Sequence, residues 1–238
     1  METLLLFADA PTAGAPKPRL ALERGEIAAR TLAAGFLADV ADTCGRWRAQ
    51  QLGADLNRKV VLYVHHGVEH PAILEAARRA GGRIEEQEGP DPAARLRRAF
   101  EAEHERGARA VCAIGTHAPS VPAHLLDEAF RALVWERAVL GPTFEGGCWL
   151  VGAQRPAPDV FTDMPWSEPD ALARTVERLR AAGVEPHLLP FWYDVEDADD
   201  LARLTWHLRS LRARHAGALP STWRALDELG LAHEGGEP

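Results

Sequence analysis

The sequence predicts a three-layer α/β/α fold around a mostly parallel, partly mixed β-sheet. Short apolar runs alternate with longer segments of helical periodicity along almost the whole chain. This alternation is typical of parallel strands joined by helices that cover both faces of a sheet. The 238 residues, of which 46% are hydrophobic, suffice for one sizeable core. We therefore expect one domain over residues 1–215 and a C-terminal tail, 216–238, with one short helix.

In the first half of the chain, the runs 4–8, 60–64 and 83–86 are predicted strands. Helical spacing of apolar residues predicts a helix over 26–50, a second from Pro71 and a third opened by Asp91 as N-cap before Pro92. The residues expected to face the core from these helices are Ala33, Leu37, Val40, Cys44 and Trp47, then Ile73, Leu74 and Ala77, then Leu96 and Phe100.

In the second half, the predicted strands are 110–114, 138–140, 148–151 and 187–189. Helices are expected from Pro122 to Leu133, and to Ala182 after the sequence S-E-P-D at 167–170, which resembles a capping box. The apolar stripe of the last long helix consists of Leu201, Leu204, Leu208 and Leu211.

Composition and charge narrow the class of partner. The net charge of −8 repels nucleic-acid phosphates, so we expect no nucleic acid partner. Cys44, Cys112 and Cys148 have no motif spacing and are expected to be reduced thiols of a cytoplasmic protein. No apolar segment is long enough for a signal peptide or a membrane span. The sequence leaves the oligomeric state open.

The loop after the first strand, A-D-A-P-T-A-G-A-P-K-P-R-L at 8–20, can hold phosphates. Ala8, Pro11 and Gly14 allow close backbone approach, and Lys17 and Arg19 supply positive charge. A proline-stiffened connection with two solvated cations is an equal alternative. With Lys17 taken as exposed, its replacement by alanine is expected to weaken nucleotide binding roughly ten- to a hundredfold and to change stability little.

The loop after strand 110–114 reads G-T-H-A-P, with Thr116 and His117 at its centre. A histidine at a strand end can be a metal ligand, a base or a donor to phosphate, although a lone histidine is more often structural.

The loop 141–147, G-P-T-F-E-G-G, joins two predicted strands. Gly146 and Gly147 indicate a tight turn or close ligand approach, and a plain hairpin turn is the alternative. Glu145 is the only ionisable group in this loop.

Acidic residues follow the last strand, in Y-D-V-E-D-A-D-D-L at 193–201. Oxygen ligands at a strand end suit Mg²⁺ or Mn²⁺, and Asp194 and Glu196 are the ligand candidates. Asp197, Asp199 and Asp200 are expected only to favour the start of a helix.

Taken in order, these segments resemble a bacterial family of glycosyltransferase-A-fold proteins, distantly related to molybdenum-cofactor guanylyltransferase and phospholactate guanylyltransferase. The segment 7–20 fits the family's motif F-A-R-A-P-x-x-G-x-x-K-T-R-L. The segment G-T-H-A-P at 115–119 aligns with the family's motif G-S-D-x-P. The segment 141–152, G-P-T-F-E-G-G-C-W-L-V-G, aligns with the family's motif G-P-x-x-D-G-G-Y-Y-L-I-G. The segment 165–169, P-W-S-E-P, aligns with the motif P-W-S-T-P. The segment 194–201, D-V-E-D-A-D-D-L, aligns with the family's motif D-V-D-T-P-E-D-L.

The resemblance implies a nucleotide-diphospho-sugar transferase fold with a nucleotide and a divalent metal, Mg²⁺ or Mn²⁺. The residues implied for the nucleotide are Ala8, Pro11, Gly14, Lys17, Arg19 and Thr116; those for the substrate pocket are Gly146, Gly147 and Trp166; those for the metal are Asp194, Glu196 and His117. His117 and Glu145 stand where the family has aspartates, Pro18 where it has threonine, and Asp9 where it has a basic residue. Imidazole is a poor ligand for Mg²⁺, so the metal can differ, be held by Asp194 and Glu196 alone, or be absent.

Three functions follow from this resemblance. The first is transfer of a sugar from a nucleotide-sugar to a small acceptor, with Lys17 and Arg19 neutralising the diphosphate and Glu145 or His117 acting on the acceptor. The second is a nucleotidyltransferase that activates a small phosphorylated molecule with an NTP. The third is a non-catalytic ligand-binding member with a degenerate metal site.

Overall fold

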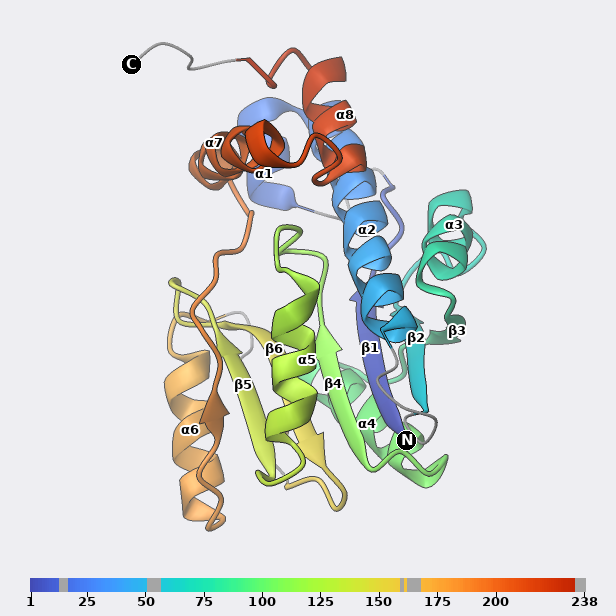
Figure 1. Ribbon diagram of the computed structural model, residues 1–238, viewed down its shortest axis with the longest axis vertical. Helices are drawn as coiled ribbons and strands as arrows, with labels where there is room; N and C mark the ends of the chain where they lie inside the picture. Colours follow the sequence, from blue (N-terminus) through green and yellow to red (C-terminus); the bar gives the residue numbers. More distant parts are fainter. Residues whose placement is uncertain (13–16, 51–56, 159–160, 162–167, 234–238) are drawn as a thin grey trace.

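The computed structural model describes residues 1–12, 17–50, 57–158, 161 and 168–233. Its strands form one seven-stranded sheet in the order β3-β2-β1-β4-β6-β5-β7 (Figure 1). The strands are β1 Glu2–Ala8, β2 Arg58–Val64, β3 Arg83–Glu86, β4 Ala110–Ile114, β5 Ala138–Pro142, β6 Cys148–Gln154 and β7 His187–Leu188. The helices are α1 Pro18–Arg24, α2 Glu26–Ala49, α3 Pro71–Ala80, α4 Pro92–Glu105, α5 Ala123–Ala132, α6 Ala171–Ala181, α7 Ala198–Arg214 and α8 Pro220–Glu228.

The sheet is mixed, as predicted. Strand β1 pairs in parallel with β2 and β4, and β2 pairs in parallel with β3. Strand β6 runs antiparallel to its neighbours β4 and β5, and β7 extends β5 in parallel. The carboxyl ends of β1, β2 and β4 therefore meet at one edge of the sheet, which is where ligands bind in folds of this kind.

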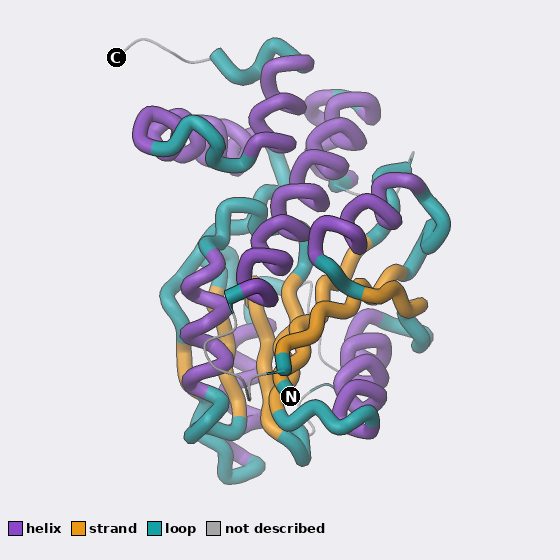
Figure 2. The backbone as a smooth tube through the Cα atoms, turned by 45° about the vertical axis from the view of Figure 1, so that its right-hand side comes forward, coloured by secondary structure: helices purple, strands orange, loops and turns teal. Residues whose placement is uncertain are grey.

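Each face of the sheet has its own core. On one face, Leu4 and Leu6 of β1 pack with apolar residues of α2, α3 and α5. On the other, Leu5 packs with Phe100 of α4 and Leu179 of α6. The alternation along β1 follows from the period of two in a strand, and it confirms the predicted three layers (Figure 2).

A third core lies beyond the carboxyl edge of the sheet. The first half of α2 extends past the strands and carries Leu32 and Phe36, which pack with α1, α7 and α8. These three helices lie above the ends of β1 and β4 in Figure 1. The expected helix of the C-terminal tail is α8, and its residues Ala225 and Leu226 are buried in this core.

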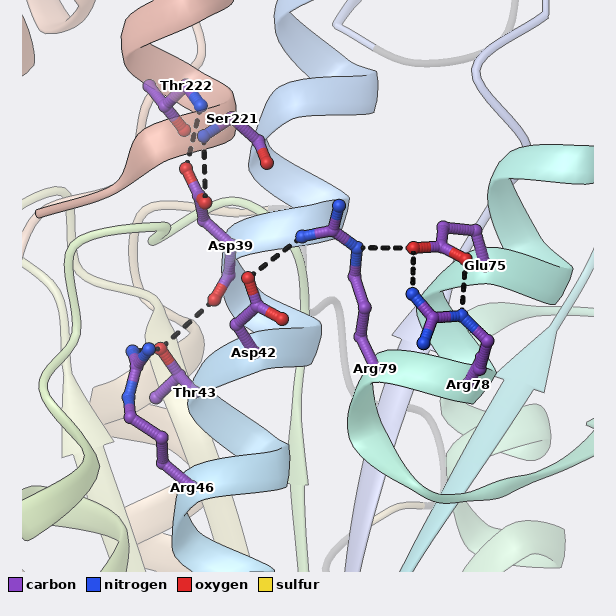
Figure 3. Close-up of polar contacts among 9 residues, drawn as sticks. All are labelled: Asp39, Asp42, Thr43, Arg46, Glu75, Arg78, Arg79, Ser221 and Thr222. Atoms are coloured by element: carbon purple, nitrogen blue, oxygen red, sulfur yellow. Dashed lines mark hydrogen bonds and ion pairs between the residues drawn. The ribbon is translucent and has the colours of Figure 1, made fainter. Parts of the chain in front are cut away.

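Polar contacts tie α2 to α8 and α3 (Figure 3). The buried carboxylate of Asp39 accepts hydrogen bonds from the backbone N–H groups of Ser221, at 3.1 Å, and Thr222, at 2.7 Å, so a residue of α2 caps the start of α8. Burial raises the pKa of Asp39, and these two hydrogen bonds oppose the rise. On the next turn, Arg79 of α3 donates to Asp42 at 2.9 Å.

Some local predictions are wrong. Leu74, expected to face the core, is 51% exposed. The buried face of α3 is formed by residues such as Ile73 and Ala77, and Leu74 lies at its border. The helix expected after the sequence at 167–170 begins at Ala171, later than predicted, with Asp170 as N-cap and without a side-chain capping bond; Ser167, the expected cap, lies outside the described residues. The Asp91 cap of α4 is confirmed, with Asp91 accepting from Ala94 N at 2.8 Å.

The three cysteines carry free thiols. Cys44 and Cys112 are buried free thiols, and Cys148 is a half-buried one. Among the described residues, no helix combines the length and the apolar character that crossing a membrane requires.

Candidate functional site

Residues from three separate parts of the sequence meet at the carboxyl edge of the sheet. Lys17 precedes α1, His117 follows β4, and Glu196 lies in the segment between β7 and α7. The Lys17 ammonium donates to Glu196 Oε1 at 3.0 Å and lies 2.9 Å from His117 Nδ1. His117 Nδ1 and Glu196 Oε1 are also in direct contact. We call Lys17, His117, Asp194 and Glu196 the edge cluster; the structure thus brings together residues that the sequence singled out separately.

Local hydrogen bonds fix the segment that carries the acidic residues. Val195 N donates to the carbonyl of His117 at 2.8 Å, which joins this segment to the loop after β4. The Ser120 hydroxyl donates to the Tyr193 hydroxyl at 2.9 Å. Asp197 accepts from Asp200 N at 3.1 Å, which confirms the predicted cap of α7. The backbone of the segment that carries Asp194 and Glu196 is therefore fixed by contacts within the protein.

Lys17 is buried, which corrects the expectation of an exposed cation. Its side chain is 2% exposed, and its ammonium lies 5.9 Å from the centre of the Phe36 ring. Burial lowers the pKa of Lys17, and the charge of Glu196 opposes that effect. Lys17 also adopts a left-handed backbone conformation, with φ of 63°, which is unfavourable for a residue with a Cβ. Such strain persists where surrounding contacts hold it, and functional sites are common places for it.

The two carboxyl groups of the edge cluster differ in acidity. Burial raises the pKa of Asp194 to about 6, while the charges of His117 and Lys17 act in the opposite direction. Burial also opposes ionisation of Glu196, but the hydrogen bond and charge of His117, together with Lys17, hold its pKa at about 2. Neighbouring acids with separated pKa values are the arrangement expected for one fixed charge and one proton-transfer group.

The cluster does not fit a divalent metal in this arrangement. Among the described residues, Asp194, Glu196 and His117 do not bring three ligand atoms within 4.8 Å of one another. The charge of Glu196 is already compensated by Lys17, whose ammonium contacts both Glu196 and His117. Lys17 is thus the cation between two of the three predicted ligands.

The loop 143–147 is a tight turn between β5 and β6. Gly147 N donates to the Thr143 hydroxyl at 2.9 Å. Gly146 has φ of 86°, and a Cβ there would lie 1.7 Å from the carbonyl oxygen of Pro169, so this position requires glycine. Glu145 is exposed, and its negative charge contributes to the raised pKa of Asp194.

The other predicted residues lie around this edge. The Arg19 side chain is 61% exposed and lies 3.7 Å from Asp197. Ala8 is buried at the end of β1, and Pro11 and Thr116 are half-buried. Gly14 and Trp166 lie outside the described residues.

A family profile and several solved structures match this chain. Residues 48–168, just over half of the chain, match the family described as "Uncharacterized protein conserved in bacteria (DUF2064)". The matched range contains His117 and Glu145 but not Lys17, Asp194 or Glu196. No curated protein matches.

One matching structure is from Desulfovibrio desulfuricans G20 and is described, provisionally, as a nucleotide-diphospho-sugar transferase. It is 26% identical, with a TM-score of 0.78 and 96% of each chain covered. The 4-diphosphocytidyl-2C-methyl-D-erythritol synthase of Anaerococcus prevotii DSM 20548 is 10% identical, with a TM-score of 0.55, covering 87% of this chain and 98% of that one.

A third matching structure is glucosyl-3-phosphoglycerate synthase from Mycobacterium tuberculosis, solved with Mn²⁺, UDP and glucosyl-3-phosphoglycerate. It is 12% identical, with a TM-score of 0.51, covering 98% of this chain and 81% of that one. The two matches of low identity show the fold alone. Together the matches confirm the predicted glycosyltransferase-A fold.

Proposed function

The chain belongs to the bacterial DUF2064 family, and on that premise we propose that it transfers a sugar from a nucleotide-diphospho-sugar to a small acceptor. The observation that carries this proposal is the edge cluster, which gathers a cation, an imidazole and two carboxyl groups of different acidity at the ligand edge of a glycosyltransferase-A sheet. The likeness to the Desulfovibrio structure over 96% of both chains supports the same class of substrate.

We assign the diphosphate to the exposed groups around Lys17. The Arg19 guanidinium is 61% exposed and can donate two parallel hydrogen bonds to phosphate oxygens, and the His117 side chain is 54% exposed. Lys17, whose charge is paired with Glu196, holds Glu196 and His117 in position. Backbone at Ala8, Pro11 and Thr116 borders the same edge and would receive the rest of the nucleotide.

We assign proton transfer to Asp194. A carboxyl with a pKa of about 6 is a suitable general base near neutral pH. In the transfer, the acceptor hydroxyl oxygen bonds to the anomeric carbon as the bond from that carbon to the diphosphate oxygen breaks. The hydroxyl proton goes to Asp194, and the electron pair of the broken bond leaves with the nucleoside diphosphate. Glu145, exposed beside the cluster, would orient the acceptor.

No step of this mechanism uses a divalent metal, because Lys17 already compensates the charge of Glu196. We therefore expect nucleotide binding to persist in EDTA. An absolute requirement for Mn²⁺ or Mg²⁺ would contradict this mechanism and would again make Asp194 and Glu196 candidate metal ligands.

A binding panel tests the proposal. UDP-, GDP-, CDP- and TDP-sugars and the free NTPs are compared by calorimetry and thermal shift, each with Mn²⁺ and with EDTA. We expect one nucleotide-sugar to stabilise the protein more than the matching NTP does. Stabilisation by none of these ligands in either condition contradicts the proposal.

Two other outcomes identify the alternative functions. Preference for an NTP, with pyrophosphate released when a phosphorylated acceptor is added, indicates a nucleotidyltransferase; CTP and GTP are the first to test. Binding without turnover indicates a ligand-binding protein, and in that case gain of Mg²⁺-dependent turnover in His117→Asp would show that the native site is degenerate.

A further inference from the structure

A second group of polar side chains lies at the same sheet edge, on the other side of β1 from His117. Asp9 follows directly after β1, and His65 and His66 follow directly after β2. The pairing of these strands continues past their ends, since His65 N donates to Ala8 O at 3.2 Å and Ala10 N donates to His66 O at 3.0 Å. The backbone therefore holds the three side chains together independently of any ligand.

The geometry of this group suits a metal ion. Asp9, His65 and His66 each offer one ligand atom, and these atoms lie within 4.8 Å of one another. Asp9 Oδ1 is 3.2 Å from His66 Nδ1 and 3.8 Å from His65 Nδ1. The side chains are between 34% and 63% exposed, so an ion can reach them from solvent.

We propose that Asp9, His65 and His66 form a binding site for a divalent transition metal, with Zn²⁺ as the first candidate. Two imidazoles and one carboxylate are a ligand set that Zn²⁺ and its neighbours accept, whereas Mg²⁺ prefers oxygen ligands. Three protein ligands leave a coordination position for water or for an oxygen of a bound molecule. The site is separate from the edge cluster and does not depend on the proposed function.

Arg95 of α4 competes with the metal for His65. Its guanidinium lies 2.6 Å from His65 Nε2, and because arginine only donates, Nε2 must accept and the proton of the neutral ring is on Nδ1. A metal on Nδ1 needs that proton on Nε2 instead. Binding therefore displaces the Arg95 contact, so removal of the Arg95 side chain should tighten metal binding. A nonspecific surface site has no reason to show this response.

The experiment uses the full chain without a histidine tag, stripped with EDTA and dialysed. Co²⁺ is titrated while its visible absorption is followed, and Zn²⁺ is then used to displace it in competition with a chelator. We expect one ion per chain and a low-coordinate Co²⁺ spectrum. Asp9→Ala, His65→Ala and His66→Ala should each weaken binding at least tenfold, since loss even of groups that only support a ligand costs about ten- to a hundredfold.

His215→Ala, which removes an exposed histidine elsewhere, is the matched control and should bind as the parent does. Arg95→Ala should bind several-fold more tightly. Far-UV circular dichroism and the melting temperature of each stripped variant establish that it is folded. Absence of stoichiometric binding, equal affinity in His66→Ala and His215→Ala, or binding only by pairs of chains in sedimentation would each overturn the proposal.

Discussion

Lys17 carries the positive charge of the edge cluster inside the protein. A buried ammonium is tolerated only when a partner compensates its charge, and Glu196 is that partner at 3.0 Å. The same contact keeps Glu196 ionised and leaves Asp194 as the carboxyl that can exchange a proton near neutral pH. One lysine therefore affects both the stability of the fold and the division of roles between two acids.

Replacing Lys17 by alanine should lower the free energy of unfolding by about 1 to 3 kcal/mol, because it removes a buried ion pair and leaves the half-buried Glu196 with His117 as its remaining partner. Urea unfolding at pH 7 measures this. Lys59→Ala is the control, since Lys59 is exposed at the start of β2 and should change stability by less than about 0.5 kcal/mol. Equal small losses in both variants would mean that Lys17 is not buried as described.

Asp194 should make stability depend on pH. Its pKa in the folded protein, about 6, lies above the usual value near 4, so the folded protein holds this proton more tightly than the unfolded chain does. This difference adds to the free energy of unfolding in full below about pH 4, and the added stability is lost as pH rises to about 6. Asp194→Asn cannot ionise and avoids this loss. Its stability relative to the parent should rise between pH 4 and pH 7 by up to about 3 kcal/mol.

Unfolding curves of the parent and Asp194→Asn at several pH values, with sugar transfer measured in parallel, test this assignment. We expect the variant to bind nucleotide and to lose transfer. A pH-independent difference between the two proteins would contradict the raised pKa, and retained transfer would remove Asp194 from the role of base.

At the scale of elements, α2 connects the parts of the fold. Its second half packs on the sheet, its first half extends past the sheet edge, and Asp39 lies on its face toward α8. The neighbouring helices approach it closely, since a Cβ on Gly45 would lie 2.5 Å from the carbonyl oxygen of Arg79 in α3. Small residues and a buried cap thus set the positions of α3 and α8.

Asp39→Ala should lower the free energy of unfolding by about 1 to 2 kcal/mol, the usual cost of losing an N-terminal cap. It removes the acceptor of two backbone N–H groups, of which that of Thr222 is buried. Asp170→Ala is a matched control, because Asp170 is the N-cap of α6 but makes no side-chain capping bond. Denaturant unfolding measures both variants. Similar losses in the free energy of unfolding would mean that the two hydrogen bonds accepted by Asp39 do not stabilise the fold.

At the scale of the whole molecule, the sheet and the third core are one structure joined through α2. The strands and helix faces could be predicted because they depend on local periodicity, as in β1 and in the Leu37, Val40 and Cys44 face of α2. The burial of Lys17 could not, because its partner lies 179 positions away in the sequence. The approach of Asp9 to His65 and His66 likewise depends on the pairing of β1 with β2, which no local pattern encodes.

Removing residues 216–238 tests where the domain ends. This deletion takes away α8 and exposes the faces of Leu32 and Phe36 that pack against Leu226. We expect a clear fall in melting temperature and a gain of dye binding to exposed apolar surface. An unchanged melting temperature would instead support a domain that is complete at residue 215.

The long separation between Lys17 and Glu196 also matters while the protein is being made. At roughly 5–20 residues per second, the ribosome adds Glu196 about 10 to 35 seconds after Lys17, given the 179 positions between them. In the course of that interval β2 and β4 are added to β1, while the acid that compensates Lys17 is still absent. The edge cluster is therefore complete only after Glu196 has been added, and a ligand that needs the whole cluster cannot guide the folding of the segments made before it.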